Sequence, residues 1–143
     1  MRVLFDTSVL VAAALKEHSH HLRALPWLKR AHSGDIEFFI CAHSLAEMYS
    51  AFTNIPTRPR ISPAQAWRLI QYNVEAAQVI ELSVNDYGSA IQKVSGMGLV
   101  GGIIYDALIV HAAEKSRADH VLTFNEKHYR PICPSDGSLL LIP

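Results

Sequence analysis

The stretch RVLFDTSVLVAAAL, from Arg2 to Leu15, places one acidic residue between two apolar runs. Residues 2–5 are apolar enough for a short buried strand, and Asp6 follows directly. The run that begins at Thr7 predicts a helix, for which Thr7 or Ser8 is available as the N-cap. A strand followed at once by a helix is the repeating unit of α/β folds, so this stretch already indicates the fold class.

The same alternation continues along the rest of the chain. The segment TNIPTRPRISP, residues 53–63, contains three prolines and is expected to be a loop. Alternation of short strands with helices predicts an α/β fold with a mainly parallel sheet of about five strands, in a single domain spanning residues 1–143. Periodicity and composition predict the remaining strands at 36–41, 77–82, 120–124 and 138–142, and helices at 20–31, 43–52, 63–74, 84–94 and around Asp106.

Composition narrows the classes of protein that this chain can represent. Half of its 143 residues are hydrophobic, yet no apolar run reaches the roughly 18 residues of a membrane span. Asp6 comes too early for a signal-peptide core, so we expect a cytoplasmic protein without a membrane partner. Cys41 and Cys133 are too few and too far apart to indicate a disulfide framework.

The charge balance bears on nucleic-acid binding. Lys and Arg number 13 and Asp and Glu also number 13, which argues against coating nucleic acid by bulk charge. A local basic patch that faces one phosphate remains compatible with this balance. Arg58 and Arg60 are candidates for contacting RNA, although an ordinary solvated surface explains them equally well.

Three acidic residues stand in apolar surroundings. Asp106 lies in IIYDALIVHAA (103–113), Glu47 lies in SLAEMYSAF (44–52), and Asp6 follows the first strand. Removing an ion from water costs several kcal/mol unless a partner compensates. Taken singly, Asp6 could cap a helix, Glu47 could face solvent, and Asp106 could pair with Arg2 or Arg117. We favour a shared site, because ligands of α/β sheets bind outside the carboxyl ends of the strands.

Carboxylates that converge need a counter-charge. Two unit charges ~4 Å apart repel by about 4 kcal/mol at an effective dielectric constant of ~20. A divalent cation removes this cost, and an all-oxygen ligand set suits Mg²⁺, for which Mn²⁺ can substitute. Such an ion can bind a phosphate oxygen and activate a water molecule for attack. The expected metal ligands are Asp6, Glu47 and Asp106.

Four pieces of the sequence together resemble PIN-domain ribonucleases, and specifically the VapC toxins of toxin–antitoxin pairs. They are VLFDTSVLVAA, HSLAEMYSAF, IIYDALIVHAA and ADHVLTFNEKHY, in the order in which that family carries them. The resemblance implies a three-layer α/β/α sandwich and a Mg²⁺- or Mn²⁺-dependent endoribonuclease with an RNA substrate. It also implies inhibition by a cognate antitoxin and a homodimer.

One position departs from the family's pattern. Many PIN domains carry a fourth acidic residue shortly after the last motif's Thr, and Asn125 takes that place here. An amide can accept a hydrogen bond from a metal-bound water but adds no charge, so a second ion should bind weakly. We count Asn125 with the catalytic set, and expect Thr7, Ser8 and Thr123 to orient the ligands or their water.

Other signals have simpler explanations. GMGLVGG, residues 96–102, contains a GxGxxG spacing, but it follows a helical pattern and is expected to be a loop between helices. The histidines in HSHH, residues 18–21, have no second ligand pair, so a solvated loop is expected there. His111 is expected to be a core or supporting residue.

Two other functions stay open on the sequence. Haloacid-dehalogenase-like phosphatases also begin with Asp after a first strand, where it is the nucleophile. They usually need a second Asp two residues later, at the place of Ser8. A PIN-like module that binds RNA or protein without cutting is the other alternative.

Overall fold

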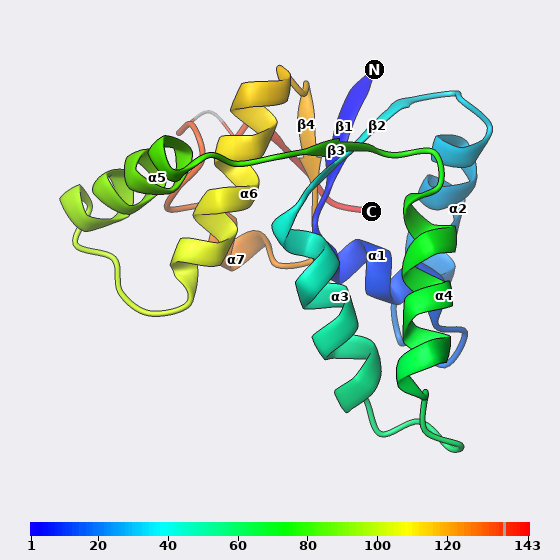
Figure 1. The fold of residues 1–143 in the computed structure, drawn as a ribbon. Coiled ribbons are helices and arrows are strands. Elements are labelled where there is room, and N and C mark those ends of the chain that lie inside the picture. Colours follow the sequence, from blue (N-terminus) through cyan, green and yellow to red (C-terminus); the bar gives the residue numbers. More distant parts are fainter. Residues whose placement is uncertain (136) are drawn as a thin grey trace.

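The computed structural model describes residues 1–135 and 137–143, and Figure 1 shows their arrangement. Strands and helices alternate through most of this chain, as predicted. The elements are β1 (Arg2–Phe5), α1 (Thr7–Ala14), α2 (His21–His32), β2 (Glu37–Cys41), α3 (His43–Asn54), α4 (Pro63–Val74), β3 (Gln78–Ile80), α5 (Val84–Gly96), α6 (Ile103–Ser116), β4 (His120–Leu122), α7 (Glu126–Tyr129) and β5 (Leu140–Leu141).

The sheet has the order β3-β2-β1-β4-β5, and each adjacent pair is parallel. β1 lies at its centre, with Leu4 opposite Phe39 of β2 on one side and opposite Val121 of β4 on the other. Along the chain, β2 and β3 are added on one side of β1, and β4 and β5 are then added on its other side. The carboxyl end of β1 is therefore the point at which strand order switches, where α/β proteins bind their ligands.

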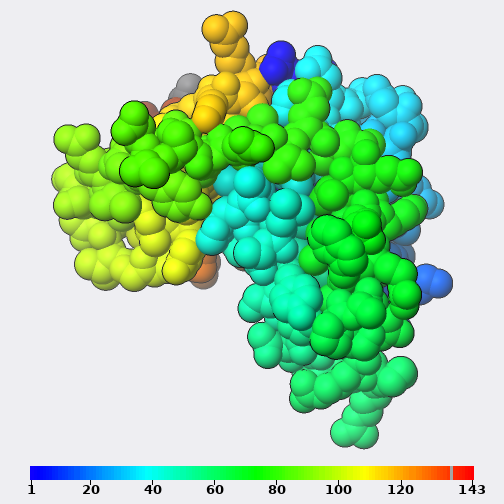
Figure 2. Space-filling model, viewed as in Figure 1, coloured from blue at the N-terminus to red at the C-terminus, as the bar shows by residue number. Residues whose placement is uncertain are grey.

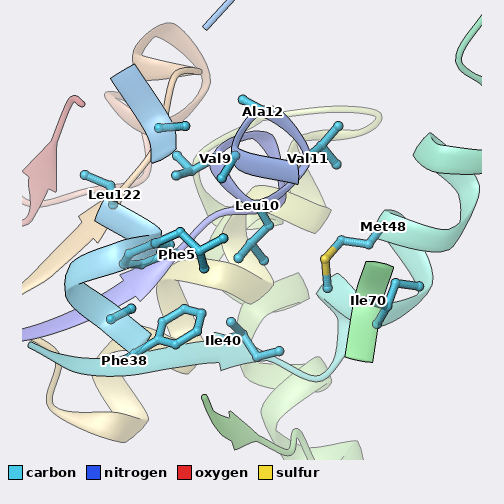
Figure 3. Packing of buried hydrophobic residues seen from close by; sticks show 14 of the residues in the cluster. Phe5, Val9, Leu10, Val11, Ala12, Phe38, Ile40, Met48, Ile70 and Leu122 are labelled. Carbon is cyan, nitrogen blue, oxygen red and sulfur yellow. The ribbon is translucent and has the colours of Figure 1, made fainter. Parts of the chain in front are cut away.

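The strands bury both faces, because successive side chains point in opposite directions. Val3 and Phe5 join a core with α1, α2, α3 and α4, whereas Leu4 joins a second core with α5, α6 and α7. β2 divides in the same way, with Phe38 facing the first core and Phe39 the second. Figure 3 shows Phe5 and Phe38 near each other in the first core, with Leu10 of α1 on the side toward that helix. Helices cover both faces, which confirms the three-layer α/β/α sandwich.

Local signals set the ends of several helices. Ser62 and Gln65 form a capping box before α4, and Ser83 and Asp86 form another before α5. The glycine-rich stretch is a turn between α5 and α6, as expected, and Gly101 there has a φ of 71°. Glycine suits such a positive φ because it has no Cβ.

Three strands are shorter than predicted by at least two residues, and one helix was not predicted: β3 spans Gln78–Ile80 instead of 77–82, and β5 spans Leu140–Leu141 instead of 138–142. β4 ends at Leu122, two residues earlier than expected, because Thr123 and the backbone of Phe124 turn from the sheet to contact Asp6 and Ser8. Glu126–Tyr129 form the short helix α7, which was not predicted because four residues are too few for a periodic signal.

Two helical arms extend from the sheet in different directions (Figure 2). One contains α5 and α6, and the other contains α3 and α4 with the proline-rich loop at its tip. No helix in the described part of the chain combines the length and apolar character needed to cross a membrane.

Candidate active site

The three predicted acidic residues line one crevice of about 710 Å³, together with Asn125. Asp6 comes directly after β1, Glu47 lies on α3, and Asp106 lies in the first turn of α6. These elements come from distant parts of the sequence and meet at the switch point of the sheet. The structure therefore places all three carboxylates at the edge where ligand binding was expected.

Asp6 is almost completely buried, with 3% of its surface exposed. Although it occupies the N-cap position of α1, its side chain makes no capping hydrogen bond. Its Oδ2 instead accepts hydrogen bonds from the hydroxyls of Ser8 at 2.6 Å and Thr123 at 2.7 Å. These hydroxyls accept the backbone N–H groups of Phe124 and Asn125 respectively. Asp6 is therefore held in one orientation rather than used as a helix cap.

Glu47 faces the crevice rather than open solvent. Burial raises the pKa of its carboxyl, and the charge of Asp6 adds to the rise, while Thr7 and His43 act in the opposite direction. His43 Nε2 lies 2.9 Å from Glu47 Oε1, and its ring stacks in parallel on that of Tyr105 at 5.1 Å. The stack links α3 to α6 beside the two carboxylates that these helices carry.

Asp106 is the third carboxylate that lines the crevice. Burial raises the pKa of its carboxyl to about 6, and the negative charges of Asp6 and Glu47 contribute, while His128 opposes the rise. His128 Nδ1 lies 3.6 Å from Asp106 Oδ2. Arg2, one of the arginines considered as a partner, instead donates to the backbone oxygen of Ser116. Asp106 therefore has the imidazole of His128 beside it.

The donor set is compatible with a hydrated, hard cation. Glu47 Oε1 has His43 Nε2 at 2.9 Å and its carboxyl also lies beside the Thr7 hydroxyl, while the buried Tyr129 hydroxyl lies beside Asp6. The carboxylates of the crevice supply oxygen ligands, which hard cations prefer. Within residues 1–135 and 137–143, no three His, Cys, Asp or Glu side chains are close enough to enclose an ion by themselves. A Mg²⁺ ion held at this crevice would therefore keep several of its own waters.

Tyr129 is a buried neighbour of the site that sequence reasoning missed. Its pKa lies well above the ordinary value because of burial, then because of the charges of Asp6 and Asp106, so the phenol stays protonated. The short helix α7 brings His128 beside Asp106 and the buried Tyr129 close to Asp6 and Asp106. The only signal in the sequence was the His128–Tyr129 pair, which follows Glu126 after one intervening residue.

The loop before α2 forms another wall of the crevice. His18, Ser19 and His20 line it together with Phe124. His21 is buried instead, with Nδ1 3.0 Å from the backbone oxygen of Ala12. The expectation of a solvated histidine loop holds in part: Ser19 is exposed and His18 and His20 are half-buried, whereas His21 is buried at the start of α2.

The candidate RNA-contacting arginines lie outside the acidic crevice. Arg58 lines a second cavity of about 490 Å³, and Arg60 lines a third. His18 borders both the acidic crevice and the second cavity, so the two are adjacent. His111 lies away from the crevice, where its Nε2 is 2.9 Å from Asp86 Oδ1 and links α6 to α5.

A model of the PIN domain matches residues 3–131 of this chain. The chain belongs to the PIN-domain family. Ribonuclease VapC27 of Mycobacterium tuberculosis is 31% identical over 114 residues, which cover 80% of this chain and 78% of that protein. The PIN-domain family is a nuclease family, and its VapC ribonucleases are in general metal-dependent. The assignment replaces the phosphatase alternative, in which Asp6 would have been a nucleophile.

Two solved structures share the PIN fold. VapBC2 from Rickettsia felis, bound to a DNA fragment from its promoter, has a TM-score of 0.69 at 20% identity, over 100% of this chain and 99% of that one. VapC20 of Mycobacterium tuberculosis, a toxin that cleaves the sarcin-ricin loop, has a TM-score of 0.68 at 14% identity, over 88% and 92%. At these identities, the likeness concerns the fold.

Proposed function

We propose that this PIN-domain protein is a Mg²⁺-dependent endoribonuclease, with Mn²⁺ able to substitute, and the toxin of a toxin–antitoxin pair. The observation that carries the proposal is the convergence of Asp6, Glu47 and Asp106 on one crevice at the switch point of the sheet. The identity to a named VapC ribonuclease supports the reaction class.

The proposed metal ligands are Asp6, Glu47 and Asp106. A bound ion would supply an activated water and neutralise charge on the phosphodiester. Asp6 is oriented by the hydroxyls of Ser8 and Thr123, so one of its oxygens is already committed to hydrogen bonds. Asp106 and Glu47 have raised pKa values because of burial, so a cation would favour their ionised forms.

Asn125 lines the crevice as the fourth member of the proposed catalytic set. Its backbone N–H donates to Thr123 Oγ1 over 2.9 Å, which fixes the start of the loop that carries it. The amide side chain can hydrogen-bond to water or substrate but supplies no negative charge. We infer that the site holds one ion tightly, and a second only weakly.

The proposed partners follow from the family and from neighbouring cavities. A cognate antitoxin is supported by the structural neighbour VapBC2, a toxin–antitoxin complex. We also propose a homodimer, as the family resemblance implies. Arg58 and Arg60 are proposed to hold the RNA backbone beyond His18, because their cavities continue from the acidic crevice.

The deciding experiment compares RNA cleavage by wild type, Asp106→Asn and Glu75→Gln with Mg²⁺ or Mn²⁺ supplied. Glu75 is exposed at the end of α4 and serves as a matched loss of one negative charge. We expect wild type and Glu75→Gln to cut equally, leaving 5′-phosphate and 3′-hydroxyl ends, and Asp106→Asn to lose at least 100-fold, roughly the loss of a key charge-stabilising group. Equal cutting by all three, or none by wild type, would favour the non-catalytic module.

A further inference from the structure

A column of stacked side chains stands beside the acidic residues. The rings of His20 and Phe124 are 4.4 Å apart and nearly parallel, at 16°. The guanidinium of Arg23 lies over the Phe124 ring, 5.3 Å from its centre. The two rings come from opposite ends of the sequence, and both line the acidic crevice.

The column is tied directly to the acidic site. The backbone N–H of Phe124 donates to Ser8 Oγ over 3.2 Å, and Ser8 donates to Asp6. Phe124 also lies between Thr123, which binds Asp6, and Asn125. A group that rests on this column is therefore held at a defined position relative to the Asp6 carboxylate.

His18 adds a polar group to the same wall. Its Nδ1 accepts the backbone N–H of His20 at 3.1 Å, which leaves the ring proton on Nε2. Burial lowers the pKa of His18, and the charges of His20 and His21 lower it further, so the neutral ring predominates at neutral pH. The ring lies 5.8 Å from that of His20, tilted by 45°. His18 thus offers a neutral N–H donor beside a flat aromatic surface.

These features suit a nucleobase better than a phosphate. The nearby carboxylates repel a second anion, whereas a base is neutral and has a π face that stacks on aromatic rings. A base also presents carbonyl oxygens or ring nitrogens that accept hydrogen bonds. The arginine cavity on the far side of His18 is where the next stretch of phosphate backbone would be attracted.

We propose that His20, backed by Phe124, is a stacking subsite for one base next to the cleaved phosphodiester of single-stranded RNA, with His18 as its hydrogen-bond donor. That the ligand of this subsite is RNA rests on the proposed ribonuclease function. It would make His18 and His20 determinants of where the enzyme cuts, separate from the carboxylates that support the reaction.

The test measures stacking without cleavage. Single-stranded RNA oligonucleotides carrying the fluorescent base 2-aminopurine at successive positions are bound to Asp106→Asn, alone or combined with His20→Ala or His20→Phe. We expect fluorescence to be quenched at one position in Asp106→Asn, to recover with His20→Ala, and to be quenched again with His20→Phe. The affinity of the His20→Ala form should fall about tenfold, the usual scale for one base stacked on one aromatic ring.

A second measurement separates the subsite from a purely structural role of the stack. In the otherwise wild-type enzyme, His20→Ala should raise KM more than it lowers kcat. RNA that lacks the base at the stacked position should have a raised KM with wild type, but its KM with His20→Ala should not rise any further. His20→Phe should restore KM. The subsite is overturned if quenching is the same in all forms. It is also overturned if removing the base raises KM as much for His20→Ala as for wild type.

The two proposals fail in different ways. Position-specific quenching that depends on His20, without cleavage by wild type, supports the subsite and rejects the nuclease. Cleavage that is lost in Asp106→Asn, with quenching indifferent to His20, supports the nuclease and rejects the subsite. Binding of Mn²⁺ to His20→Ala should match wild type, since His20 is outside the proposed ligand set, and a loss there would assign His20 to the metal site instead.

Discussion

Thr123 Oγ1 donates a hydrogen bond to Asp6 Oδ2 over 2.7 Å, although 117 residues separate the two in sequence. The same hydroxyl accepts the backbone N–H of Asn125. One side chain therefore joins the ends of two adjacent strands, β1 and β4, to the loop that carries the fourth member of the catalytic set.

Thr123→Val should reduce both stability and activity. Valine has a similar shape, but it leaves the buried Asp6 oxygen with one hydroxyl donor fewer and the Asn125 N–H without its acceptor. We expect unfolding in urea to show a loss of about 1–3 kcal/mol, the cost of unsatisfied buried polar groups. Thr123→Ser should recover most of it. The control is Thr53→Val, because the Thr53 hydroxyl makes only solvent-exposed hydrogen bonds to backbone oxygens of its own helix, α3. An equal loss of stability in Thr53→Val would show that Thr123 has no special role.

Asp106 should make the metal-free protein less stable as pH rises. Its pKa is raised to about 6 from an ordinary 3.8. Below about pH 4 the carboxyl is protonated in folded and unfolded chains alike, so burial carries no charge penalty. Between about pH 4 and pH 6 only the unfolded chain ionises, so stability falls, and above that range the full penalty remains.

To test this, the melting temperatures of wild type and Asp106→Asn are measured across this pH range, and their difference is taken at each pH. The difference isolates Asp106 from other titrating groups. Because a cation binds the ionised carboxyl, Mn²⁺ should raise the wild-type Tm more at about pH 7.5 than at about pH 5. Parallel pH curves for the two proteins, or a Mn²⁺ effect that is independent of pH, would contradict the assignment.

Asn125→Asp should strengthen the binding of a second ion. The substitution keeps the size of the side chain and adds one negative charge to a crevice already lined by three carboxylates. Calorimetric titration with Mn²⁺ should show about one site in wild type and a second, weaker site in Asn125→Asp. Without metal, the variant should melt at a lower temperature because of added repulsion. An unchanged stoichiometry would show that Asn125 does not face the ion.

Arg58→Ala and Arg60→Ala should weaken RNA binding without affecting metal binding. For single-stranded RNA, each phosphate contact contributes ~0.7 to the steepness with which log K falls as log salt concentration rises. Each lost contact should therefore make that slope less steep by the same amount. Lys93→Ala is the control, since Lys93 pairs with Glu114 on the α5–α6 arm. Equal salt dependence of all three variants and wild type would place RNA elsewhere.

Much of the fold could be predicted because its signals are local. Val3, Leu4 and Phe5 alternate their side chains between two cores, so three apolar residues were enough to predict a buried strand. The Ser62–Pro63 start of α4 and the Ser83–Asp86 capping box depend on contacts within one turn. The embedding of Asp106 in an apolar helix also identified it as unusual before its neighbours were known.

The sequence alone determined the α/β class and the three acidic residues, because burial periodicity and carboxylates in apolar runs are properties of short segments. Only the tertiary structure decided that β4 lies beside β1, which brings Thr123 to Asp6 and Phe124 to His20. It also decided that α7 brings His128 beside Asp106 and the buried Tyr129 close to Asp6. These contacts join residues about a hundred positions apart, and no local propensity encodes which strand will pair with which.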